Sequence, residues 1–468
     1  MFIYIRRQIM NINPQKRTLI FLNLLIICVA TSFLSTALTT ALPPIIAEFG
    51  IDAARGQWLT SIYSLVMGIT MPLTAFLITR FPTKKLYITA LFILVAGLIV
   101  CTTAHQFPML MAGRILQACS NGITTSLAQV VLLTIYPPEK KGTIMGWYGL
   151  SVGAAPVIAP TIAGLFVDTV GWRMIFIVTL CILAAALLFA FLCFDDVLDT
   201  EIRKFDVLSF ILSAFAFGGL TLGIGNISRG ITNPEAYVPL IIGVIGSIYF
   251  VYRQLHIKQP FLELRVFRQR QFTISVLGSM FLYFIMMGGS VIMPIYVQTI
   301  LGKSATISGL ATLPGSLAMA IVSPFAGKIY DKLGMKKLAV CGTIGLFFSS
   351  LGMSFITIST PVWVASALFV IRCIAIGCMM MPFVTWGVSG VSAEQIADGN
   401  ALITSLRTIA GAVGSAVFVG IMTFVSSAGA RHYGDSAAIH GLNTAFAGMT
   451  VCSLIMFIMC VGYMKKDN

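Results

Sequence analysis

The chain has 468 residues, of which 58% are hydrophobic and only 10% are charged, and its formal net charge is +14. A soluble chain carries about 25% charged residues, so this composition and a mean hydropathy of +0.95 exclude an ordinary soluble protein. The positive charge does not indicate nucleic-acid binding, because the basic residues are scattered in short segments between apolar blocks and form no basic domain.

Apolar blocks of roughly 20 residues follow one another along the chain, each about long enough to cross a ~30 Å hydrocarbon core. They lack the alternation of a β-barrel, so we predict an all-α membrane protein. Fourteen transmembrane helices are predicted at 18–42, 57–79, 85–104, 108–135, 143–167, 173–194, 206–227, 236–255, 272–301, 307–327, 337–358, 361–387, 400–427 and 443–464.

The loop charges predict the orientation of these helices. Most of the 30 Lys and Arg residues lie in alternate inter-helix segments, on the same side as the N-terminus. By the positive-inside rule both termini are cytoplasmic, N-in and C-in. The segment Met1–Arg17 has no small-residue cleavage site and is expected to be a cytoplasmic N-terminus, with Met10 as an alternative start.

One short basic sequence motif occurs twice, at 75–86 and at 327–338. Arg114 and Arg372 recur inside helices at a nearly equal offset. Both repeats predict two six-helix bundles related by a parallel pseudo-two-fold, with two extra central helices. The expected divisions are 1–17, an N-terminal bundle at 18–194, two linker helices and a connector at 195–271, and a C-terminal bundle at 272–468.

Polar side chains mark one face of the fourth predicted helix. Arg114, Gln117 and Asn121 are spaced i, i+3 and i+7, which places them on the same helix face. A buried cation costs ~3 kcal/mol or more unless it faces a cavity or a partner. Two interpretations stay open: a face lining a transport cavity, or a structural arginine bonded to backbone carbonyls.

The fifth predicted helix carries small residues and prolines, including Gly153, Pro156, Pro160 and Gly164. Small residues permit close helix contact, and prolines free carbonyl groups and bend the helix. Plain helix packing is the alternative to a specific transport role.

The second copy of the basic segment contains Gly327, Asp331, Lys332 and Gly334. Its carboxylate can cap a neighbouring helix N-terminus or pair with a cation, which would make a conformational latch. The alternative is a loop that only sets topology. In the first copy Thr79 replaces the acid beside Arg80, and Thr79 cannot form the charged contact.

These motifs, in this order, resemble those of the major facilitator superfamily, and within it the fourteen-span drug:proton antiporter branch (QacA/EmrB-like multidrug exporters). The resemblance implies proton coupling at Arg114 and an exporter signature at 149–164. The segment beginning at Arg407 also matches the group, with a structural or a substrate-binding arginine as the open alternatives.

The first helix departs from this family pattern. Leu34 replaces its acid and Thr39 its asparagine, and no Asp or Glu of the chain falls at a predicted mid-membrane position. Buried arginines without a buried acid favour neutral or anionic amphipathic substrates. The predicted substrate and coupling cavity comprises Arg114, Gln117, Asn121, Arg372, Arg407, Ser35, Thr36 and Thr39.

The sequence therefore predicts a secondary active transporter that exports amphipathic drugs or metabolites by alternating access, driven by the proton motive force. The alternative is an exporter or flippase of an anionic or lipid-like metabolite with atypical or no proton coupling. No catalytic residue set or metal cluster is found, so we expect no enzyme and no cofactor. The expected partners are a small amphipathic substrate, protons and membrane lipids, with no nucleic acid, for a monomer in a bacterial inner membrane.

Overall fold

The computed structural model describes residues 13–51, 53–198, 200, 205–226, 233–257, 260–303 and 305–463, and this part of the chain contains helices and no strand. The helices of the first half are α2 (Pro14–Phe49), α3 (Ala53–Arg80), α4 (Thr83–Thr102), α5 (Phe107–Ile135), α6 (Pro138–Thr169) and α7 (Arg173–Cys193). The middle contains α8 (Val207–Ser213), the π-helical turn η1 (Ala214–Gly218), α9 (Gly219–Gly225) and α10 (Pro234–His256). The second half begins with the 3₁₀ turn η3 (Leu264–Arg268) and contains α11 (Arg270–Ile295), the π-helical turn η4 (Tyr296–Ile300), α12 (Ala305–Leu333), α13 (Met335–Met353), α14 (Val362–Ser389), the 3₁₀ turn η5 (Ala393–Gln395), α15 (Ile396–Tyr433), the 3₁₀ turn η6 (Gly434–Ser436) and α16 (Ala437–Tyr463).

Twelve helical segments of the described chain are long and apolar enough to cross a membrane. The helices α6 and α13 lie outside that set. The helices occupy the predicted positions, but several run further: α2 continues through Pro43 and Pro44 to Phe49, and α15 has 38 residues. The second basic segment is also more helical than a loop, since α12 continues through Asp331 to Leu333 before Gly334 breaks the helix.

The two halves pack their helices in the same order. In the first half α2 packs on α6, α3 on α5, and α4 on both α5 and α7. In the second half the pairs are α11 with α15, α12 with α14, and α13 with both α14 and α16. The same pairings recur when each helix is replaced by its counterpart, which is the arrangement of two six-helix bundles repeated in parallel.

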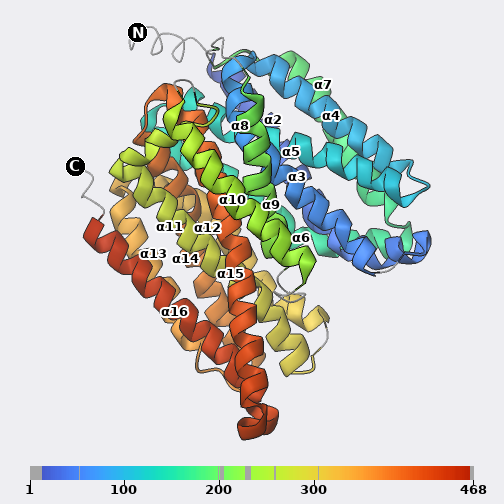
Figure 1. Ribbon diagram of the computed structural model, residues 1–468, viewed down its shortest axis with the longest axis vertical. Coiled ribbons are helices and arrows are strands. Elements are labelled where there is room, and N and C mark those ends of the chain that lie inside the picture. Colours follow the sequence, from blue (N-terminus) through green and yellow to red (C-terminus); the bar gives the residue numbers. More distant parts are fainter. Residues whose placement is uncertain are drawn as a thin grey trace.

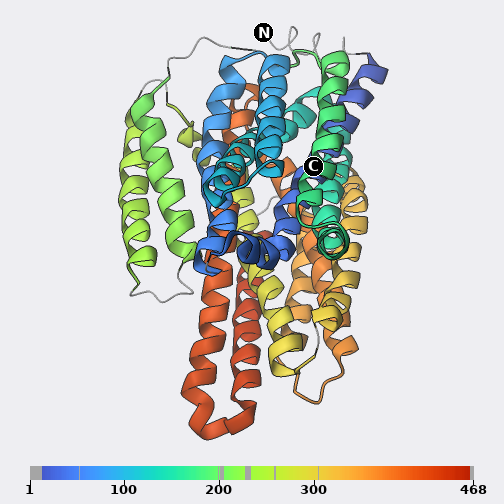
Figure 2. The ribbon, with the colours of Figure 1, turned by 90° about the vertical axis from the view of Figure 1, so that its right-hand side faces the viewer.

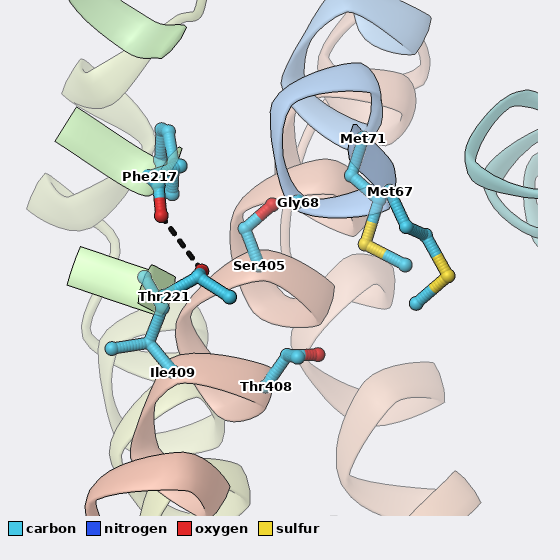
Figure 3. Close-up of a pocket in the computed structure, with 8 residues that line it drawn as sticks. All are labelled: Met67, Gly68, Met71, Phe217, Thr221, Ser405, Thr408 and Ile409. Carbon is cyan, nitrogen blue, oxygen red and sulfur yellow. Dashed lines mark hydrogen bonds between the residues drawn. The ribbon is translucent and has the colours of Figure 1, made fainter. Parts of the chain in front are cut away.

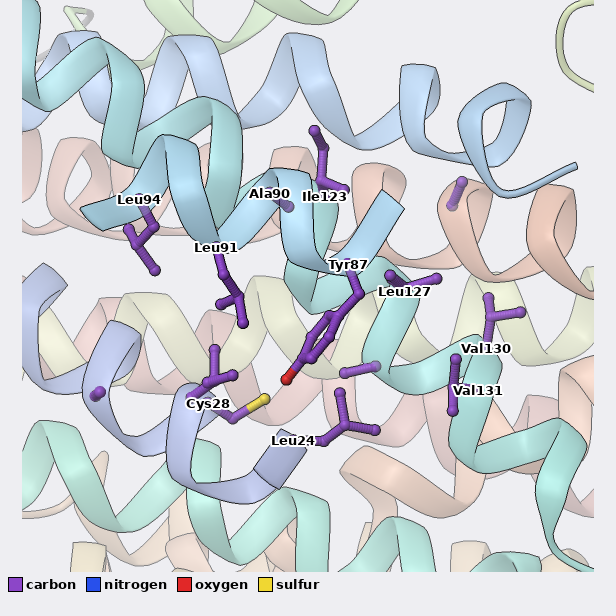
Figure 4. Close-up of a cluster of buried hydrophobic side chains, with 14 of the residues drawn as sticks. Leu24, Cys28, Tyr87, Ala90, Leu91, Leu94, Ile123, Leu127, Val130 and Val131 are labelled. Carbon is purple, nitrogen blue, oxygen red and sulfur yellow. The ribbon is translucent and has the colours of Figure 1, made fainter. Parts of the chain in front are cut away.

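The bundles converge at the end of the molecule where α2 begins and α16 ends, and their helices diverge towards the opposite ends (Figure 1; Figure 2). Each bundle has its own buried hydrophobic cluster. In the first bundle, Tyr87 of α4 packs among Leu24, Leu91 and Leu127 (Figure 4). That cluster also takes in residues of the second bundle, at the end of α14 and the start of α15: Met381, Val384, Val388, Ala397, Ala401, Leu402 and Ile403. Apolar packing therefore joins the bundles at their convergent ends.

The middle helices form a hairpin that packs on α3 and α15. Its helices lie so close that a Cβ on Gly219 would be 2.7 Å from the Cα of Gly243. At one end, Asp206 caps α8 by accepting hydrogen bonds from Ser209 and binds the guanidinium of Arg253, with Nη2 3.1 Å from Oδ1. The connector that follows buries Phe261, Leu262 and other apolar residues in the cluster of the first bundle. Its apolar side therefore faces protein.

Candidate functional site

Small residues line the contact between α6 of the first bundle and α12 of the second. A Cβ on Gly146 would lie 2.5 Å from the carbonyl oxygen of Ser323, and one on Gly149 would collide with the Ser323 side chain. Gly142 lies against Gly327 in the same way. The three glycines on α6 follow an i, i+4, i+7 spacing, which puts them on one face. Their lack of side chains lets the two bundles meet backbone to backbone.

Asp331 lies at the end of this contact, and its half-buried carboxylate binds the beginning of α6. Oδ1 accepts a hydrogen bond of 2.8 Å from the backbone N–H of Gly142. Oδ2 accepts hydrogen bonds from the backbone N–H (2.8 Å) and the hydroxyl (2.6 Å) of Thr143. An anion near a helix N-terminus also interacts favourably with the helix dipole. Next to it, Gly334 has φ 76°, which favours glycine, while Lys332 is exposed.

The first copy of the basic segment makes no comparable contact through Thr79. The Thr79 hydroxyl donates to the carbonyl oxygens of Ala75 and Phe76 in its own helix. Arg80 lies over the ring of Phe81, 6.0 Å from its centroid. The charged contact between bundles is thus found at one copy of the repeated segment.

Arg114, Gln117 and Asn121 are held inside the first bundle. The Arg114 guanidinium donates to Gln117 (2.9 Å) and to the carbonyl oxygen of Leu59, and it lies 4.1 Å from the ring centroid of Tyr63. Asn121 donates to the Tyr63 hydroxyl at 2.7 Å. In this conformation these side chains join α5 to α3 and α4.

Arg372 has the equivalent arrangement in the second bundle. Its guanidinium donates to the Ser350 hydroxyl at 3.0 Å and to the carbonyl oxygen of Ile285. The side chain is 1% exposed. Both repeated arginines therefore have hydrogen-bond acceptors within their own bundles.

The other predicted site residues make only local or ordinary contacts in the structure. The hydroxyls of Ser35 and Thr36 donate to the Ser32 carbonyl oxygen of their own helix. A Cβ on Gly153 or Gly164 would make ordinary contacts at 3.6 and 4.0 Å. The side chains of Thr39, Pro156 and Pro160 lie outside the described residues.

A polar cluster that includes Arg407 lies between the bundles. Thr404 of α15 donates to Gln129 of α5 at 3.5 Å, and Gln129 donates to the hydroxyl of Tyr148 of α6 at 3.3 Å. Arg407 is near Tyr148 and lies 4.8 Å from the ring centroid of Tyr283. Sequence reasoning found Arg407 but missed Asn400, Gln129 and Tyr148. The i, i+4, i+7 spacing of Asn400, Thr404 and Arg407 could have pointed to this face of α15.

A small pocket lies where the middle hairpin meets both bundles (Figure 3). Residues from α3, η1, α9 and α15 line it: Met67, Gly68, Met71, Phe217, Thr221, Ser405, Thr408 and Ile409. Thr221 donates to the carbonyl oxygen of Phe217, while the buried hydroxyl of Ser405 has no hydrogen-bond partner. The lining is mainly apolar with three hydroxyl groups.

An ion pair closes the other end of the first bundle. Glu48 accepts hydrogen bonds from Trp172 (2.6 Å) and pairs with Arg173 at 2.7 Å, and Arg173 also donates to the carbonyl oxygen of Ala104. Burial raises the pKa of Glu48, but the bonds from Trp172 and Arg173 lower it more, so the pKa lies below its ordinary value. Glu48 is therefore held as an anion.

Two helical bundles in parallel repeat, joined by polar and small-residue contacts and built from apolar helices, define a membrane transport protein of the secondary-transporter type. Residues 24–415 match the family model described as Major Facilitator Superfamily. The chain belongs to this superfamily, whose members are transporters.

The chain is 37% identical over 412 residues to the lincomycin resistance protein LmrB of Bacillus subtilis, covering 86% of this chain and 85% of that protein. It is 26% identical over 394 residues to the multidrug export protein EmrB of Escherichia coli, covering 82% and 76%. The fold resembles that of the proton:xylose symporter XylE, with a TM-score of 0.61 at 14% identity, covering 95% and 96%. The predicted drug:proton antiporter branch is confirmed by these relatives, and the protein is a multi-pass protein of the bacterial inner membrane.

Proposed function

We propose that this transporter exports amphipathic drugs or metabolites by alternating access, driven by the proton motive force. The similarity to LmrB and EmrB supports drug export, because the names of both proteins describe resistance or multidrug export. We further propose fourteen spans, obtained by adding α6 and α13 to the twelve apolar helices, with both termini cytoplasmic. The bundles would then comprise 18–194 and 272–468, and residues 195–271 would link them.

The contact of Asp331 with α6 is the observation that carries the alternating-access proposal. It joins the two bundles at their convergent, cytoplasmic ends through hydrogen bonds that a small relative rotation breaks. The conformation described here would therefore be closed towards the cytoplasm. Breaking the Asp331 contacts would let the inner ends separate and admit substrate.

Proton coupling requires an unusual route in this chain. Glu48 is held in an ion pair, and Leu34 replaces the family's membrane acid. Asp398, 3% exposed in the first turn of α15, is the buried carboxyl group nearest to the polar cluster along the chain. We propose that Asp398 takes part in coupling.

Transport into inverted membrane vesicles tests the proposed function. With lincomycin and the anionic amphiphile taurocholate as probes, we expect uptake when the vesicle interior is acid and its loss when nigericin collapses the pH gradient. Asp398→Asn is expected to uncouple transport from the gradient, while Glu48→Gln keeps the coupling. Uptake of neither probe would refute drug export, and uptake unaffected by nigericin would refute proton antiport.

A further inference from the structure

Arg407 is a buried cation without a fixed counter-charge. It is 5% exposed, and its Nε and Nη1 atoms have no hydrogen-bond partner. Its described contacts are with the Tyr283 ring and, electrostatically, with Tyr148. Arg114 and Arg372 are equally buried, but each donates to acceptors in its own bundle. A buried donor left unpaired destabilises the structure, and more so when it is charged.

A second polar group on the same helix face is also unpaired. Asn400 is fully buried, and neither its Nδ2 nor its Oδ1 has a partner. It lies seven residues before Arg407, about 10 Å along the helix axis. Thr404, between them, contacts Gln129 of the other bundle. Unsatisfied donors from α15 therefore face a set of polar groups on α5 and α6.

The charges around this cluster favour an anion. No ion pair to Arg407 occurs in the described part of the chain, and Asp398 is nine residues away, about 13 Å along α15. Tyr148, Gln129 and Asn400 are neutral polar groups of the same cluster, so none of them supplies a counter-charge to Arg407. The planar guanidinium of an arginine can donate two parallel hydrogen bonds to the oxygens of a carboxylate, sulfonate or phosphate group.

We propose that Arg407, with Asn400, Gln129 and Tyr148, binds the anionic head group of an amphipathic substrate. The site lies between the bundles, about 16 Å along α15 from its first residue. Separation of the bundles at their convergent ends would expose it. The aromatic ring of Tyr283 stacks beside the guanidinium and provides an apolar surface for the body of the substrate. This inference rests on the proposed export function and specifies its substrate class.

The experiment compares two probes of opposite charge on the purified protein. Taurocholate has a sulfonate on a rigid apolar body, and tetraphenylphosphonium is a lipophilic cation. We would measure the rise in melting temperature that each probe produces, and its transport into proteoliposomes. The variants are Arg407→Gln, Arg407→Lys and, as a charge-matched control on an exposed loop, Lys303→Gln.

We expect taurocholate to raise the melting temperature of the wild type and of Lys303→Gln. Arg407→Gln should weaken taurocholate binding and transport by about tenfold or more, the loss expected for charged hydrogen bonds. Arg407→Lys should bind with intermediate affinity, because it keeps the charge and loses the planar guanidinium. Proteoliposomes with and without phosphatidylglycerol separate a soluble organic anion from a lipid phosphate: competition by the anionic lipid would assign the site to lipid head groups.

Equal taurocholate binding by the wild type and Arg407→Gln would overturn the proposal, as would a larger stabilisation by tetraphenylphosphonium. A wild type that transports tetraphenylphosphonium but not taurocholate would also overturn it, while the export function stands. If neither probe is transported, the binding measurement still decides the anion site, and lincomycin uptake into inverted vesicles decides the export function separately.

Discussion

Gly142 and Gly327 face each other across the boundary between the bundles, so closely that a Cβ on Gly327 would lie 2.1 Å from the carbonyl oxygen of Gly142. Two backbones at this separation leave no space for a methyl group. The contact places Asp331 directly over the N–H groups at the start of α6. The close approach of the two glycines and the hydrogen bonds of Asp331 therefore occur at the same contact. Each can be tested by its own substitution.

Gly327→Ala is expected to force the convergent ends of the bundles apart and to abolish most transport. Gly146→Ala should act in the same direction, because its Cβ would lie 2.5 Å from the Ser323 carbonyl oxygen. Gly153→Ala is the matched control on α6, since its nearest neighbour would be 3.6 Å away. Drug efflux from cells at equal expression measures the effect. Normal efflux by Gly327→Ala would contradict this close approach.

Asp331→Asn keeps the side-chain shape but removes the charge and weakens its three hydrogen bonds. We expect the closed convergent end to lose about 1–2 kcal/mol, roughly a 5–30-fold shift in population. Distances between spin labels at the start of α6 and the end of α12 measure this shift. Thr79→Ala is the control at the other copy of the segment, and a shift of equal size in Thr79→Ala would argue against the asymmetry.

Arg372→Met is expected to destabilise the second bundle, because it leaves the Ile285 carbonyl oxygen and the Ser350 hydroxyl without their donor. The expected loss is about 2 kcal/mol in unfolding free energy. The melting temperature of the purified protein measures it. Arg407→Met should be nearly neutral or stabilising in the same assay, because it removes two unpaired buried donors. Equal destabilisation by both variants would contradict the difference between the two arginines.

The Glu48 pair predicts a limited acid sensitivity. Because the folded state lowers the pKa of Glu48 below 4.5, its contribution to stability is present above that pH and is lost as the pH falls through the folded pKa. Glu48→Gln should lower the melting temperature at pH 7 and flatten its decline below pH 4.5. Burial raises the pKa of Asp206, but its bonds with Ser209 and Arg253 lower it more, so this pKa also lies below its ordinary value. We therefore expect Asp206 to lose its contribution to stability in acid in the same way. Melting curves of Glu48→Gln, Asp206→Asn and the double variant separate the two contributions.

The sequence allows the helix positions and the repeat to be predicted well, because hydropathy and span length are imposed by the membrane. It does not reveal which way a polar face turns. Arg114 and Arg372 were predicted to line the central cavity, yet in this conformation each contacts neighbours in its own bundle. Helical spacing defines a face of a single helix, whereas the neighbours of that face depend on tertiary packing.

One side of the contact between the bundles is visible in the sequence. Gly142, Gly146 and Gly149 already stand on one helix face in the sequence, but only the segment from Gly149 onward resembles a known signature. The partner of Asp331 required the structure, because nothing in residues 327–338 specifies which helix lies opposite. The same is true of Gln129 and Tyr148, whose importance comes from Arg407 on a distant part of the chain.

The hydrophobic cluster shared by the two bundles has a consequence for the cell's energy supply. Met381, Val384 and Leu402 pack the convergent ends with buried apolar side chains, among which an ion would have to lose its water. A resting protein of this kind would not leak ions or protons. We expect vesicles containing the idle transporter to hold a pH gradient as long as empty ones, so that many copies can reside in a membrane without dissipating its potential.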